Sequence, residues 1–151
     1  MKVERVLAIG VFDLFHVGHL RYLQFASTRG SRLVVAVTLD HMAAKVKGRE
    51  PLIPQEQRLE LVRGFGFVAE AELVPASTEM TAAAADWIEA WNIHHVVSGG
   101  SWKGSERWAR LEPVLLKRGI SVEYAPHTEG VSTTGIIDKA LQKFGRSEPL
   151  C

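Results

Sequence analysis

Residues 33–39 form an almost unbroken run of aliphatic and β-branched side chains. Strands of this kind are buried on both faces, and they occur mainly in parallel sheets that helices cover on both sides. Shorter apolar runs recur along the chain and alternate with helix-like segments, which favours a parallel sheet with right-handed crossovers. The expected strands are residues 3–9, 33–39, 72–74, 95–98 and 121–125.

The segments between these strands carry helix signals of different strength. Gly30 suits a helix end, Pro54 suits a first turn, and Ser132 can cap the last helix. Residues 42–53 contain several cations and show no clear periodicity, so we interpret them as a flexible basic loop. The expected helices are residues 20–28, 54–63, 81–91, 105–117 and 133–144.

This alternation predicts an α/β fold with a five-stranded, parallel, doubly wound (Rossmann-like) sheet. The length suits one domain over residues 1–151, with residues 145–151 as a frayed tail. Trp87 and Trp91 fall on the apolar stripe of one expected helix, so we assign them to the core or to a subunit interface rather than to base stacking.

The composition excludes several classes of function. A net charge of +1, from 18 basic and 17 acidic residues, argues against a nucleic-acid-binding protein. No apolar stretch is long enough to cross a bilayer, and the amino terminus lacks the layout of a signal peptide. The single cysteine, Cys151, can form neither an internal disulfide nor a cysteine–histidine metal cluster. We therefore expect a cytoplasmic protein that meets no membrane.

The decapeptide of residues 10–19 (GVFDLFHVGH) lies between the first expected strand and its helix. A helix start offers unpaired N–H donors and the positive end of a dipole. Gly10 and Gly18 would let an anion approach the main chain, and His16 and His19 would add donors, or positive charge if protonated. The stretch predicts a polyphosphate site. The alternative interpretation is ordinary helix capping by the histidines and Asp13.

Two further turns follow expected strands at the same sheet edge. Residues 99–102 follow the fourth strand and residues 128–134 follow the fifth. Open α/β sheets bind ligands beyond the carboxyl ends of their strands, where the strand order reverses. We therefore expect both turns to meet the decapeptide in one pocket beside the first strand.

The pattern G-x-F-D-x-x-H-x-G-H in residues 10–19 resembles the signature of the small nucleotidylyltransferases, and it includes their HxGH motif. Residues 128–134 (TEGVSTT) match the carboxyl-terminal signature of the same family, and residues 45–47, 54–58 and 99–102 are similar to its intervening motifs. The resemblance covers nearly the whole chain. It implies an enzyme that transfers a nucleotidyl group from a nucleoside triphosphate (NTP) to a phosphate monoester and releases pyrophosphate.

The resemblance also implies roles for particular residues. His16 and His19 would contact the bridging and α/β phosphate oxygens, and Lys45 or Lys47 would close over the phosphates. Mg²⁺ would arrive with the NTP, with no metal ligands from the protein, and the enzyme would be a homodimer. The remaining nucleotide contacts would be Gly10, Val11, Phe12, Asp13, Gly18, Gly99, Ser101, Trp102, Thr128, Gly130, Val131, Ser132 and Thr133, and the acceptor contacts would be Arg58, Arg63 and His127.

The motifs point to more than one pair of substrates. The sequence of residues 128–134 resembles the cytidylyltransferase branch, which implies CTP as the nucleotide. The best single acceptor is then glycerol 3-phosphate, giving CDP-glycerol. Residues 48–58 look closer to ATP-dependent adenylyltransferases acting on heptose 1-phosphate. His127 and Gly100-Ser101 depart from the glycerol-3-phosphate pattern, which has arginine and an Asp-Asp pair there. A non-catalytic regulatory domain is the alternative from another class, which the intact His16, His19, Lys45 and Ser132 disfavour.

Overall fold

The sheet contains five parallel strands in the order β3-β2-β1-β4-β5. The computed structural model describes residues 4–145. This arrangement confirms the parallel α/β sheet expected from the sequence, and the strand order reverses beside β1. The strands are β1 (Arg5–Gly10), β2 (Arg32–Val37), β3 (Glu70–Leu73), β4 (His95–Ser98) and β5 (Ser121–Tyr124).

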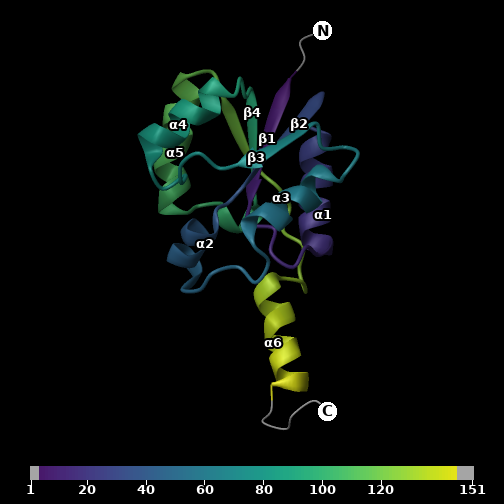
Figure 1. Ribbon diagram of the computed structural model, residues 1–151. Helices are drawn as coiled ribbons and strands as arrows, with labels where there is room; N and C mark the ends of the chain where they lie inside the picture. Colours follow the sequence, from purple (N-terminus) through teal and green to yellow (C-terminus); the bar gives the residue numbers. More distant parts are fainter. Residues whose placement is uncertain (1–3, 146–151) are drawn as a thin grey trace.

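Helices cover both faces of this sheet, α1 and α3 on one side and α4 and α5 on the other (Figure 1). Helix α6 projects away from the body of the molecule beyond the carboxyl ends of the strands (Figure 1). No helix within residues 4–145 has the length and apolar character needed to cross a membrane. The helices are α1 (Val17–Ser27), α2 (Asp40–Lys47), α3 (Gln55–Arg63), α4 (Thr81–Ala90), α5 (Glu106–Lys117) and α6 (Thr133–Phe144), with a 3₁₀ turn η1 (Gly100–Trp102).

The alternating side chains of β1 divide the core into two layers. Val6 and Ala8 pack with Leu23 of α1 on one face, whereas Leu7 packs with Trp87 of α4 on the other. All of these side chains are buried, so both faces of the central strand are covered, as the apolar sequence of the strands predicts. The burial of Trp87 also confirms its assignment to the core.

Residues 42–53 do not form the flexible loop that we expected. Residues 40–47 form helix α2, which begins at Asp40, carries Lys45 and Lys47 in its last turn, and ends at Gly48 with φ +76°. Charges placed in this way stabilise both ends of a helix dipole, and glycine adopts the left-handed cap without steric cost. The prediction was wrong because so short a helix buries a single residue, Ala43, and leaves no readable periodicity.

Two smaller expectations concern the helix ends. Gly30 does not cap α1, which ends at Ser27 with Thr28 as its C-cap. A Cβ on Gly30 would lie 2.5 Å from the side chain of Val6 and 2.7 Å from the carbonyl of Glu4, so this glycine lets the chain pass close to β1. Ser132 caps α6 as predicted. The tail expected at residues 145–151 lies, from residue 146 onward, outside the described residues.

Candidate active site

The site lies at the carboxyl edge of the sheet, beside β1 and β4. The strand order reverses here, because β2 and β3 lie on one side of β1, whereas β4 and β5 lie on the other. Tyr22 of α1 spans this point: its hydroxyl accepts a hydrogen bond from the N–H of Ile9 at 3.0 Å and donates to the carbonyl of Val97 at 2.6 Å. Burial raises the pKa of Tyr22 far above its ordinary value. Tyr22 was not predicted as a site residue, because in the sequence it is only one of several residues of an amphipathic helix.

His16 and His19 stack at the start of α1 with their ring centres 3.7 Å apart. Nδ1 of His16 accepts a hydrogen bond from the N–H of Gly18 at 3.1 Å, and Nδ1 of His19 accepts one from the N–H of His16 at 3.2 Å. The pair therefore forms a reciprocal capping box. Because both Nδ1 atoms accept, the proton of each neutral ring must sit on Nε2, which remains available as a donor. Capping and phosphate binding are thus compatible roles.

Both imidazoles are held neutral. Burial, with a smaller contribution from the positive charge of Lys47, lowers the pKa of His16. Burial also lowers the pKa of His19 to about 4, with His16 and Lys47 adding to the effect. The two rings therefore offer hydrogen-bond donors at neutral pH, rather than the positive charge that protonated histidines would bring to the phosphates.

The glycines of the decapeptide make room for its own rings. A Cβ on Gly18 would lie 2.9 Å from Cε1 of His16, and one on Gly10 would lie 2.7 Å from the ring of Phe12. Phe12 itself has φ +58°, a strained conformation of the kind that clusters at functional sites. The structure thus gives Gly10 and Gly18 a packing role, where the sequence suggested close approach of an anion.

The start of α6 joins the decapeptide although the two are far apart in sequence. Oγ1 of Thr133 donates to the carbonyl of Asp13 at 2.8 Å, a contact that spans 120 residues. Oγ of Ser132 accepts from the N–H of Gly135 at 2.9 Å, which leaves the hydroxyl proton free to donate to a ligand. The predicted convergence of the two motifs at one sheet edge is therefore confirmed.

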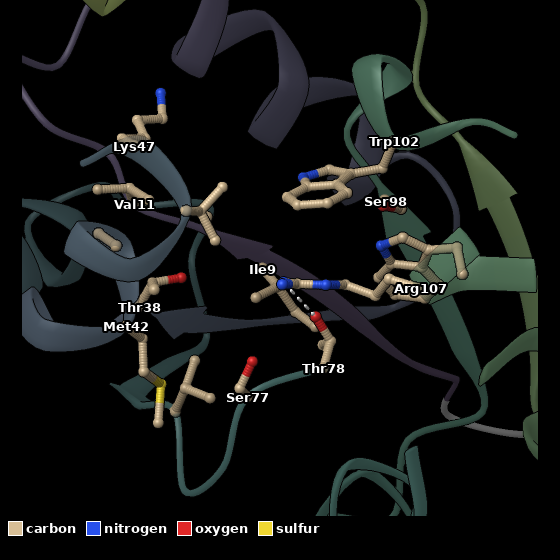
Figure 2. Close-up of a pocket in the computed structure, with 15 residues that line it drawn as sticks. Ile9, Val11, Thr38, Met42, Lys47, Ser77, Thr78, Ser98, Trp102 and Arg107 are labelled. Carbon is tan, nitrogen blue, oxygen red and sulfur yellow. Dashed lines mark hydrogen bonds between the residues drawn. The ribbon is translucent and has the colours of Figure 1, made fainter. Parts of the chain in front are cut away.

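Three adjoining cavities surround these residues. The central cavity, of about 270 Å³, includes Asp13, His19 and Trp102. The α6-side cavity, of about 210 Å³, includes His16, His127 and Ser132. The β2-side cavity, of about 100 Å³, lies between α2 and α5 and is lined largely by apolar side chains (Figure 2). Lys47 borders all three cavities.

Most of the predicted nucleotide contacts lie on these cavities. Lys47 acts on both histidines electrostatically, whereas Lys45 is exposed and borders none of the three cavities. Gly130 forms the left-handed turn before α6 and does not line them. His127, which we predicted as an acceptor contact, lines the α6-side cavity beside the α6 motif. The predicted nucleotide contacts that line the central or α6-side cavity are Gly10, Val11, Phe12, Asp13, Gly18, Gly99, Ser101, Trp102, Thr128, Val131, Ser132 and Thr133.

Arg58 lies beneath the site, and four of its five N–H donors bond to the protein itself. The fully buried guanidinium donates to the carbonyls of Val11 at 2.6 Å and Thr38 at 2.8 Å, and pairs with Asp40 at 2.6 Å. Its Nε donates to the carbonyl of Ile53 at 2.8 Å. The direct acceptor contact expected of Arg58 is therefore not what the structure shows; this arginine ties the loops after β1 and β2 to the start of α3.

Asp13 completes this network, which we call the latch. Its carboxylate accepts hydrogen bonds from the N–H groups of Leu52 and Ile53, both at 2.9 Å, so it fixes the loop that follows α2. Arg63, the other predicted acceptor contact, instead donates to the carbonyl of Ala71 and pairs with Glu72. The structure does not bring Arg63 to any of the three cavities.

Two contributors to the site were missed from the sequence. Arg107 and Thr78 both border the β2-side cavity (Figure 2). Neither belongs to a recognisable motif, because their meeting depends on how α5 packs beside the loop after β3. Within residues 4–145, no three histidine, cysteine or acidic side chains gather as a metal site would require.

Comparison with known proteins places this site in context. A family profile described as cytidylyltransferase-like matches residues 7–139. An FAD synthase of Thermococcus onnurineus is 50% identical over 149 residues, which cover 95% of each chain. The bifunctional protein HldE of Halorhodospira halophila is 38% identical over 87% of this chain, which spans only 26% of HldE. A lipopolysaccharide core biosynthesis protein of Thermoplasma volcanium has a similar structure, with a TM-score of 0.66, 30% identity and coverage of 83% of this chain and 96% of that one.

Proposed function

The chain belongs to the cytidylyltransferase-like family, and from that premise we propose that it transfers AMP from ATP to flavin mononucleotide (FMN), giving FAD and pyrophosphate. Nucleotidyl transfer as the type of reaction agrees with the family and with both groups of relatives. The choice of substrates is the proposal. The observation that carries nucleotidyl transfer is the meeting of two neutral Nε2–H donors, a capped helix start and Lys47 around adjoining cavities. The choice of ATP and FMN rests on the relative named FAD synthase.

The relatives support ATP over CTP. FAD consists of FMN joined to AMP through a pyrophosphate bridge, so a protein named FAD synthase that covers 95% of this chain supports adenylyl transfer. CTP with glycerol 3-phosphate is the second candidate, because the sequence of residues 128–134 resembles the cytidylyltransferase branch. Heptose 1-phosphate is an acceptor to include in any screen, because residues 48–58 resemble adenylyltransferases that use it.

In the proposed reaction, an oxygen of the acceptor phosphate attacks the α-phosphorus in line. The new P–O bond forms as the bond to the bridging α/β oxygen breaks, and pyrophosphate leaves. Catalysis then consists of alignment and of stabilising the charge that develops on the phosphate oxygens. Nε2 of His16 and of His19 would donate to those oxygens, while Lys47 would act as a point charge.

The triphosphate end would lie against the start of α6. Ser132 offers its hydroxyl proton there, and the first turn of the helix offers backbone N–H groups. Mg²⁺ would enter as the complex with ATP and offset the charge of the departing pyrophosphate. We also propose a homodimer, which rests on the family resemblance alone.

A substrate panel tests the proposed reaction. Pyrophosphate release is measured for ATP and CTP, each with FMN, glycerol 3-phosphate and heptose 1-phosphate, and products are identified by mass. We expect FAD from ATP and FMN. A faster reaction of CTP with glycerol 3-phosphate would instead establish the second candidate, and tight nucleotide binding without any turnover would establish a regulatory domain.

A further inference from the structure

Arg107 presents a fixed cation at the far wall of the β2-side cavity. Its guanidinium carbon lies 4.7 Å from the centre of the Trp102 ring. Nη1 donates to Oγ1 of Thr78 at 3.2 Å, and Nη2 pairs with Glu79 at 3.4 Å. Only 16% of the Arg107 side chain is exposed. A guanidinium carries five N–H donors, so several remain available to a ligand after these two contacts.

The rest of this cavity has a different character. Met42, Val46 and Val74 supply apolar surface, and Lys47 lies on the opposite side from Arg107 (Figure 2). Lys47 also borders the central cavity with His19, where the phosphorus would be transferred, whereas Arg107 does not. The cavity therefore has a cation at each end and apolar walls between them.

This layout places different demands on the two ends of an acceptor. The end beside Lys47 suits a phosphate. The walls suit a flat apolar surface, and the planar fork of Arg107 suits carbonyl oxygens at the remote end. A short polyol phosphate would satisfy the first demand only, because it carries neither a flat apolar surface nor carbonyl oxygens.

We infer that Arg107, stacked on Trp102, is the specificity-determining contact for the acceptor, and that it selects a flat ring with carbonyl oxygens at the end remote from the phosphate. The isoalloxazine ring of a flavin belongs to this chemical class. The inference rests on the proposed function, since it takes the β2-side cavity to be the acceptor site. Beyond the proposed function, Arg107 is assigned as the residue that selects the acceptor, and the carbonyl oxygens of the acceptor ring are the group that it recognises.

Binding of FMN without ATP tests this inference directly, through quenching of flavin fluorescence on titration with protein. The variants are Arg107→Met, which keeps length but removes the donors, and Arg107→Lys, which keeps the charge but removes the planar fork. Arg110→Met is the matched control, because Arg110 is an exposed arginine on the same helix. We expect the Kd for FMN to rise about tenfold or more in Arg107→Met, with little rescue by lysine.

Steady-state kinetics separate specificity from structure. In Arg107→Met the KM for FMN should rise while the KM for ATP stays within about twofold, and Arg110→Met should match the wild type. An unchanged affinity for FMN in Arg107→Met would overturn the inference. So would a parallel rise in the KM for ATP together with a lowered Tm, because that pattern marks a structural role.

The outcomes also separate this inference from the proposed function. If the wild type transfers a nucleotidyl group to a polyol phosphate and Arg107→Met does so equally well, the inference fails and nucleotidyl transfer stands. If the wild type consumes no NTP with any acceptor, the proposed function fails. FMN titration still decides the role of Arg107 in that case, since it needs no turnover.

Discussion

The histidine pair and the latch differ in what their polar groups do. Nδ1 of His16 and of His19 caps a helix while Nε2 remains free. In the latch, both oxygens of Asp13 and the donors of Arg58 contact the protein itself. A charged residue in a site motif can therefore serve the ligand or the loops that surround it, and the contacts of its individual atoms distinguish the two roles.

The largest effect should come from removing a free donor. His19→Ala should lower kcat by about 10²–10³, because one hydrogen bond to the developing charge is lost. His41→Ala is the control, since His41 is exposed on α2 and borders none of the three cavities. Pyrophosphate release under saturating substrates measures the effect. Equal rates for His19→Ala and the wild type would remove the histidine pair from the mechanism.

Substitution of Arg58, whose guanidinium bonds to the protein itself, should lower the stability of the fold before it affects substrate binding. Arg58→Met leaves Asp40 and three backbone carbonyls without their partner, so we expect a loss of about 3 kcal/mol in the free energy of unfolding. Arg63→Met should cost less than about 1 kcal/mol, because its ion pair with Glu72 is exposed. Urea unfolding of both variants gives the comparison. A stable Arg58→Met protein with a raised KM for the acceptor would restore the direct contact.

The two lysines of α2 should also differ. Lys47→Ala should raise the KM for ATP about tenfold, because Lys47 borders the cavities and acts on both histidines. Lys45→Ala should change that KM by less than about twofold, since Lys45 faces solvent. Initial rates over a range of ATP concentrations measure both values. Equal effects of the two substitutions would mean that α2 moves when the nucleotide binds.

A smaller effect should appear in the dependence of stability on pH. The ordinary pKa of histidine is 6.5, and burial lowers the pKa of His19 to about 4. Between these values the unfolded chain binds more protons than the folded one, so stability falls as pH falls through this window. We expect His19 to contribute about 2 kcal/mol of this loss, allowing for its partial exposure. His19→Gln should flatten the profile between pH 6.5 and 4, and an identical slope would contradict the lowered pKa.

The sequence predicted the positions of strands and helices better than it predicted the side-chain contacts between them. β4 matches residues 95–98, and α6 begins after Ser132 as expected, because hydrophobic patterns and capping residues are local signals. Helix α2 was missed because it buries too little to show a pattern. The hydrogen bonds of Arg58 to three backbone carbonyls and Asp40, and the meeting of Arg107 with Thr78, depend on tertiary packing. No local sequence pattern predicts either set of contacts.

The central claim is that His16 and His19 are neutral Nε2–H donors directed at the triphosphate. Two-bond ¹H–¹⁵N NMR of the imidazoles tests it directly, with the two rings assigned by single substitution. At pH 7 without nucleotide, we expect both rings to be neutral Nε2–H tautomers, and a non-hydrolysable ATP analogue with Mg²⁺ should shift both Nε2 resonances. Nδ1–H tautomers, or Nε2 resonances that do not respond to the nucleotide, would contradict the account.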